Sequence, residues 1–131
     1  MPPIIAAMTR APRLLLCFVI ALLAIGIPAW GLPYDPDLTL HPELLPGAIL
    51  LGVLPLWLSI GGPASARRIF LVMSLCVPLV DIALIVRDTA IDPTNHNLWP
   101  LELVFSWVLG AAIILPGLFV GVVLRALLRR R

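Results

Sequence analysis

Two carboxylic acids interrupt parts of the sequence that are otherwise apolar. Asp81 lies inside the segment 69–87, and Glu102 lies at the start of the segment 101–124. A carboxylate is costly in hydrocarbon, so an acid in such a place is a candidate for binding a proton or a ligand. Arg87 is the nearest base to Asp81, but a separation of six residues puts it about 240° away around a helix. We therefore expect Asp81 to be protonated, reached by water, or neutralised by a ligand or another subunit.

Both acids also have a structural interpretation. Asp81 can be a neutral acid that is hydrogen-bonded to a neighbouring helix. Pro100 followed by Glu102 is an ordinary helix start, because proline is tolerated in the first turn and the helix dipole favours an acid there. If the segments 69–87 and 101–124 form an antiparallel hairpin, the two carboxyl groups can approach one another. Together they predict a site for a proton or a cation.

A metal site is a weaker hypothesis. The candidates are His41, His96 and Asp92, with Glu102 as a further oxygen donor, and nitrogen with carboxylate ligands suits zinc or a similar cation. The two histidines and Asp92 lie in loops, however, and loops alone rarely fix the geometry of a metal. Turn and capping chemistry explains the Asp-Pro and Pro-x-Glu elements without a ligand. We expect neither a metal nor a cofactor.

The composition defines the class of protein that carries these residues. The chain has 131 residues, of which 61% are hydrophobic and 12% charged, and its mean hydropathy is +1.09. A soluble globular protein has roughly 25% charged residues. The balance excludes a soluble enzyme, a nucleic-acid-binding protein, a disordered tail and a disulfide-stapled secreted domain. Cys17 and Cys76 both fall inside apolar segments, so we expect no disulfide between them.

Four segments are long enough to cross a membrane, at residues 14–34, 44–62, 69–87 and 101–124. A helix needs about 20 apolar residues to span the ~30 Å hydrocarbon core of a bilayer. Each segment must be helical, because lipid offers no partner to an unpaired backbone group. The sequence predicts an all-α integral membrane protein with four transmembrane helices in a single domain over residues 1–131.

The arginines predict the orientation. All nine basic residues are arginine, and all but Arg87 flank the segments on one side of the membrane. These eight are Arg10, Arg13, Arg67, Arg68, Arg125, Arg129, Arg130 and Arg131. The positive-inside rule makes that side cytoplasmic, so both termini are expected inside. The absence of lysine hints at a GC-rich bacterial genome, and we expect the bacterial inner membrane.

The two loops on the other side resemble each other. The first reads DPDLTLHPEL from Asp35, and the second reads DPTNHNLWPLEL from Asp92. This likeness suggests two similar helical hairpins. The first segment also has an alternative interpretation as a signal peptide that is cleaved after Ala29. That alternative stays open at this stage.

Small residues predict the faces through which the helices pack, because close backbone approach drives helix association in lipid. Gly110, Gly117 and Gly121 share a face of the fourth segment with Ser106, and Ala48 and Gly52 share a face of the second with Pro55 and Ser59. In the third segment one face holds Ser74, Pro78, Asp81, Ile85 and Asp88, and Cys76 points away from it.

Proline is the other notable feature of the segments. Pro78 removes a backbone hydrogen bond and frees the carbonyl group of Ser74, on the face of this segment that also holds Asp81. Transporters often build ion sites beside such interruptions, although proline is common in membrane helices in general. The pattern is therefore compatible with a site and with ordinary packing.

The sequence favours a small, multi-pass, non-enzymatic membrane protein that acts as an accessory or subunit. Its expected partners are the lipid bilayer and either further copies of itself or another membrane protein, with no nucleic acid. The alternative is a small oligomeric transporter coupled to protons or cations through Asp81 and Glu102. A third hypothesis is a membrane enzyme or metal-binding protein that uses His41, His96 and the acids of the loops.

Overall fold

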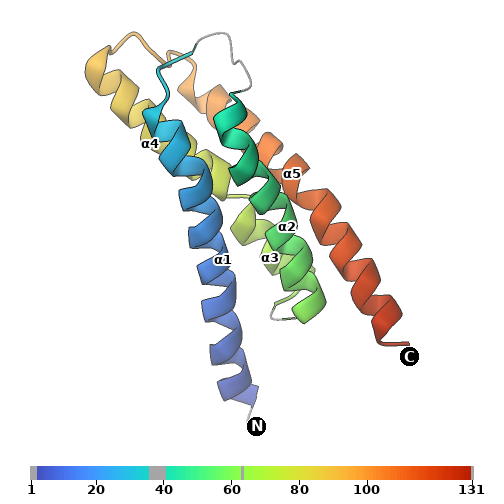
Figure 1. Ribbon diagram of the computed structural model, residues 1–131. Coiled ribbons are helices and arrows are strands. Elements are labelled where there is room, and N and C mark those ends of the chain that lie inside the picture. Colours follow the sequence, from blue (N-terminus) through green and yellow to red (C-terminus); the bar gives the residue numbers. More distant parts are fainter. Residues whose placement is uncertain (1–2, 36–40, 63, 131) are drawn as a thin grey trace.

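The computed structural model describes residues 3–35, 41–62 and 64–130, and these residues form helices joined by turns and short loops. The elements are α1 (Pro3–Gly31), the 3-10 helix η1 (Pro42–Leu44), α2 (Leu45–Gly61), α3 (Ala66–Met73), α4 (Cys76–Ile91) and α5 (Trp99–Leu128). Figure 1 shows them as one bundle of long, roughly aligned helices. The expected all-helical class is confirmed.

Four helical stretches are long and apolar enough to span a membrane, and they cover Ala11–Gly31, Pro42–Gly61, Ala66–Ile91 and Trp99–Leu128. In the most apolar part of each stretch, only 28% of the residues are buried within the bundle. Large hydrophobic side chains therefore face outward along every helix, such as Ile27, Ile49 and Phe119 with exposed fractions of 69%, 64% and 71%. Such surfaces are unfavourable in water. They indicate a membrane-embedded protein.

The third stretch differs from the single helix expected over residues 69–87. A turn at Ser74 and Leu75 interrupts the regular helix, so α3 and α4 are separate helices within one stretch. Pro78 contributes to this break, because it lies in the first turn of α4 and has no N–H to donate to the carbonyl group of Ser74. The helix also continues to Ile91. Arg87 and Asp88 consequently lie within α4, beyond or at the end of the expected segment.

The other helix ends follow from local sequence. Helix α1 ends at Gly31, three residues before the expected end, because Leu32 precedes Pro33 and the residue before a proline avoids helical geometry. Helix α2 ends where Gly62 adopts a left-handed conformation with φ 64°, and its N–H donates to the carbonyl of Leu58 at 3.1 Å. This is the usual glycine stop signal.

The core lies where α1, α2 and α4 meet and where α2 packs along α5. One face of α1 is buried against its neighbours, through Leu14, Cys17, Ala21, Ile25 and Ala29. Helix α5 packs most extensively against α2, and next against α4. The Cys76 thiol lies 3.7 Å from the carbonyl oxygen of Phe18 on α1. Cys76 therefore faces α1, away from the face of α4 that meets α5.

The bundle has two chemically different ends (Figure 1). Both chain termini and the connection from α2 to α3 lie at one end, which we call the arginine end because it holds the arginines of α3, α5 and the start of α1. The end of α1 and the loop that follows α4 lie at the opposite end, which we call the loop end. Arg131, one of the eight arginines that predict the orientation, lies outside the described residues.

Candidate functional site

The turn that leaves α4 determines where His96 points. The N–H of Asp92 donates to the carbonyl of Asp88 at 2.9 Å and ends the helix. The Asp92 carboxylate then accepts bonds from the backbone N–H of Thr94 at 2.9 Å and from its hydroxyl at 2.7 Å. The bonds from the backbone and hydroxyl of Thr94 lower the pKa of Asp92. His96 follows with φ 57°, a left-handed conformation that is uncommon outside glycine.

This conformation places the His96 ring between two carboxylates from different helices. Nε2 lies 3.1 Å from Oδ2 of Asp88 on α4. Nδ1 contacts Oε2 of Glu102 in the first turn of α5. The His96 side chain is only 8% exposed, so these bonds are shielded from water. The histidine thus joins the end of α4 to the start of α5.

Arg87 ties the same group to α1. Its Nε and Nη2 atoms both lie 2.6 Å from Oδ1 of Asp88. Nη1 donates to the backbone carbonyl of Trp30, near the end of α1. The guanidinium carbon also lies 5.5 Å from the centre of the Trp30 ring, within the range of a cation–π contact. We call Arg87, Asp88, His96 and Glu102 the loop-end cluster.

Tyr34 covers the remaining side of the histidine. Its ring centre lies 4.6 Å from that of His96, with the planes at 62°. Such an edge-to-face arrangement is favourable for aromatic rings. The segment after α1 therefore contributes to the same site. The loop-end cluster thus connects residues 87–102 to the end of α1, where Trp30 lies 57 residues before Arg87.

The protonation of His96 follows from its neighbours. Burial of the ring disfavours its charged form, but the bonds to Glu102 and Asp88 outweigh burial and raise the pKa of His96 above its ordinary value. A neutral imidazole has one N–H and one lone pair. Only an imidazolium can donate from both ring nitrogens to two carboxylates. The site is therefore built to hold a proton.

Asp81 lies on α4 about two helical turns from Asp88, on the side toward the arginine end. Its side chain is half-buried, lies close to Ser106 on α5, and lies within electrostatic range of Glu102 and His96. The structure thus brings Asp81 and Glu102 to the same side of the α4–α5 contact. Arg87 binds Asp88 instead of Asp81, as the helical spacing predicts.

A further polar pair lies deeper along the same contact. The Trp107 indole N–H on α5 donates to the Ser74 hydroxyl at 3.2 Å, at the break between α3 and α4. That hydroxyl in turn lies 3.3 Å from the carbonyl of Leu71. The polar side chains between α4 and α5 therefore descend in three levels, from the loop-end cluster through Asp81 and Ser106 to Ser74 and Trp107.

The metal candidates are not gathered into one site. His41 lies 3.5 Å from Asp35, Asp92 bonds Thr94, and both ring nitrogens of His96 face carboxylates. Within residues 3–35, 41–62 and 64–130, no three His, Cys, Asp or Glu side chains are arranged to hold a metal ion. No known protein family matches the chain, and neither does any curated protein or solved structure.

The packing residues expected from the sequence meet at two contacts of α5. A side chain added at Gly117 would collide with the carbonyl group of Gly52, and one added at Gly121 would come within 2.7 Å of the Leu56 carbonyl oxygen. A Cβ on Gly110 would lie 3.2 Å from the carbonyl oxygen of Ser74. Gly117 and Gly121 therefore bring α5 close to α2, and Gly110 brings it close to the α3–α4 break.

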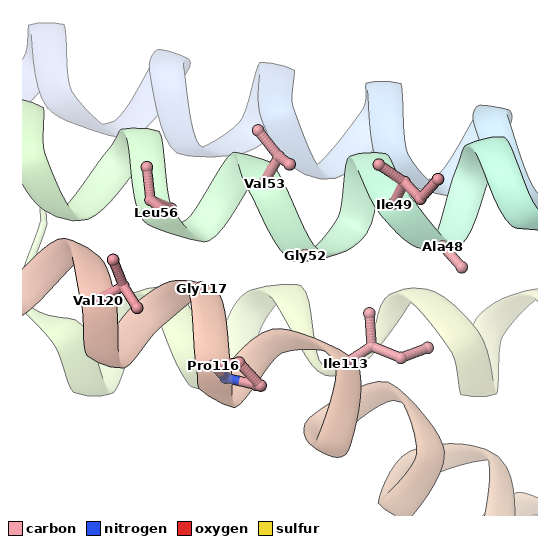
Figure 2. Close-up of a pocket in the computed structure, with 9 residues that line it drawn as sticks. All are labelled: Ala48, Ile49, Gly52, Val53, Leu56, Ile113, Pro116, Gly117 and Val120. Carbon is pink, nitrogen blue, oxygen red and sulfur yellow. The ribbon is translucent and has the colours of Figure 1, made fainter.

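An open apolar groove accompanies the α2–α5 contact (Figure 2). It encloses about 480 Å³ and is lined by Ala48, Ile49, Gly52, Val53, Leu56, Ile113, Pro116, Gly117 and Val120. Figure 2 shows α5 turning away from α2 on the Ile113 side of Pro116. Small residues and the bend at proline leave this part of the surface unfilled.

Several residues of the site were not expected from sequence alone. Arg87 and Asp88 were placed at the membrane border, without a role beside His96. Gly47 was missed as a packing residue, although a Cβ there would lie 2.6 Å from the Ala24 carbonyl oxygen on α1. One signal was available for Asp88, which shares the predicted inner face with Asp81. The position of His96 depends on its left-handed backbone conformation, which the residue types of this loop do not predict.

Proposed function

We propose that this chain is a small, non-enzymatic accessory or subunit of a bacterial inner membrane, with both termini in the cytoplasm. The gathering of arginines at one end of the bundle supports that orientation through the positive-inside rule. The resemblance between the two loop sequences supports a further proposal, that the chain consists of two similar hairpins. Burial of one face of α1 supports retention of the first span over cleavage after Ala29.

The observation that carries the proposal is the open groove between α2 and α5. Membrane helices associate where small residues let them approach. Ala48, Gly52 and Gly117 line the groove, and the exposed side chains of Ile49 and Val53 form part of its wall. A helix of a second copy or of another membrane protein fits such a surface. We therefore place the subunit contact there.

The test fills the groove without disturbing the helix contact beneath it. Val53→Trp adds bulk at a side chain that is 51% exposed. Val104→Trp is the matched control, since Val104 is 56% exposed on α5 and does not line the groove. We expect wild-type protein and the control to form a stable complex by native mass spectrometry in mild detergent, and Val53→Trp to lose it. A wild-type protein that is monomeric and alone would contradict the proposal.

A second candidate is a small oligomeric transporter coupled to protons or cations through Asp81 and Glu102. The polar levels along α4 and α5 favour it, because they lead from the loop end to Asp81 and on to Ser74. Ionisable residues that face a bundle interior commonly mark proton or ion pathways. In this second proposal, Asp81 binds the proton or cation, and Glu102 transfers it.

Flux measurements in proteoliposomes test the second candidate. Asp81→Asn preserves size and hydrogen bonding but cannot release a proton, so a proton- or cation-dependent flux should be abolished. Glu43→Gln is the matched control, because Glu43 is an exposed acid in η1 and is not part of the loop-end cluster. Its flux should equal that of wild type. An Asp81→Asn protein that transports normally would remove Asp81 from the mechanism.

A further inference from the structure

The loop-end cluster places two carboxylates against His96, whereas a neutral histidine ring has only one N–H to donate. Two carboxylate oxygens face the two ring nitrogens of His96, at Nε2 from Asp88 and at Nδ1 from Glu102. With a neutral ring, one nitrogen would direct a lone pair at a carboxylate, which is repulsive. The arrangement is favourable only when the three side chains hold one additional proton.

We propose that Asp88, His96 and Glu102 form a proton-binding clasp, which fastens the loop 92–98 across the ends of α4 and α5 while it holds its proton and releases the loop when the proton leaves to water. The site takes a proton as its ligand, and it does not depend on either proposed function. With the proton bound, the positive charges of Arg87 and His96 balance the negative charges of Asp88 and Glu102.

The parts of the clasp come from three directions. Asp88 and Arg87 approach from α4, Glu102 approaches from α5, and the Tyr34 ring packs on His96 from the segment after α1. Asp81 on α4 is the remaining acid that acts on His96 electrostatically. Every one of these acids favours the charged ring, whereas Arg87 opposes it and is neutralised by its bonds to Asp88.

The backbone supplies the force that opens the clasp. His96 is held at φ 57°, a left-handed conformation that is unfavourable for a residue other than glycine. The neighbouring Asn97 and Leu98 are exposed, so the contacts of the His96 ring are what attach this part of the loop to the helices. Loss of the proton removes one of the two hydrogen bonds of the His96 ring. Fewer contacts then offset the unfavourable backbone conformation of this residue. Opening would then give water access to Asp81 from the loop end.

The experiment follows His96 in the full chain in lipid nanodiscs. The chain has two histidines, so His41→Gln leaves His96 as the only imidazole for 15N NMR. We expect its titration midpoint to lie above the ordinary value of about 6.5. Amide protection over residues 94–102 should be constant below pH ~6.5, fall about tenfold per pH unit up to the midpoint, and then level off. The wild-type protein should give the same protection profile.

Replacement of the histidine supplies the second arm. His96→Gln keeps one donor and one acceptor but binds no proton, so protection over residues 94–102 should be low and independent of pH between 5 and 9. The proposal is overturned if the midpoint in the His41→Gln protein is at or below about 6.5, or if protection does not change across the midpoint. The His41→Gln titration decides the matter even where His96→Gln does not fold.

Discussion

The carbonyl group of Gly52 on α2 occupies the space that a side chain on Gly117 of α5 would need. The two helices thus meet backbone to backbone at the middle of the bundle. Close approach of this kind strengthens van der Waals packing, which is the main attraction between helices in lipid. The contact explains why α2 and α5 form the most extensive helix pair of the structure.

Gly117→Ala should therefore destabilise the protein. The added methyl group meets a backbone carbonyl, which cannot rotate away as a side chain can, and overpacking of this kind costs about 1–3 kcal/mol. Thermal unfolding in one detergent measures the effect. Gly31→Ala is the control, because a Cβ at Gly31 meets nothing within 4 Å. Equal unfolding temperatures for the two variants would contradict the close backbone contact between Gly52 and Gly117.

The bond between Trp107 and Ser74 gives a second prediction. Ser74→Ala leaves the indole N–H without a partner in an apolar setting, and an unsatisfied buried donor costs about 1–3 kcal/mol. Adding Trp107→Phe removes the orphaned donor as well. The double variant should therefore recover most of the stability lost by Ser74→Ala in the same unfolding assay. Additive losses would mean that the two side chains do not interact.

Periodicity in the sequence was sufficient to predict the helices and the faces that use small residues. Gly117, Gly121 and Gly52 lie where helical spacing and a preference for close packing put them. Asp81 likewise lies on the face of α4 that meets α5. These features depend on regular helix geometry, which the sequence determines directly.

The break at Ser74 and the position of His96 could not be predicted in the same way. Pro78 was recognised as an interruption, but membrane helices often bend at proline without ending. Whether the chain separates into two helices depends on what packs there, and Gly110 and Trp107 of α5 pack against Ser74. The site around His96 arises from turn geometry between α4 and α5. Turn geometry follows from tertiary contacts that periodicity does not encode.

Glu102→Gln gives a prediction for pH dependence. The carboxylates of Glu102 and Asp88 hold the pKa of His96 above its ordinary value, so removing one of them should lower that pKa. A raised folded pKa stabilises the folded state fully below the unfolded value of about 6.5 and loses that effect as the pH rises through the folded value. In Glu102→Gln the loss should begin at the same pH and end sooner.

The measurement compares unfolding of wild type and Glu102→Gln between pH 5 and pH 9. Glu43→Gln is the matched control, because Glu43 is an exposed acid in η1 and is not part of the loop-end cluster. Its stability profile should follow that of wild type. A Glu102→Gln profile that also coincides with wild type would show that Glu102 does not hold the proton of His96.

Orientation in the membrane is the last prediction. The arginine end should lie in the cytoplasm, because basic residues beside short loops are retained on that side. A reporter that is active only in the cytoplasm should work when fused after Arg131 and fail when fused after Asn95, and an export-dependent reporter should give the opposite result. Changing Arg67 and Arg68 to Glu should weaken this preference, since they precede the third span. Identical reporter activity at both fusion sites would contradict the orientation.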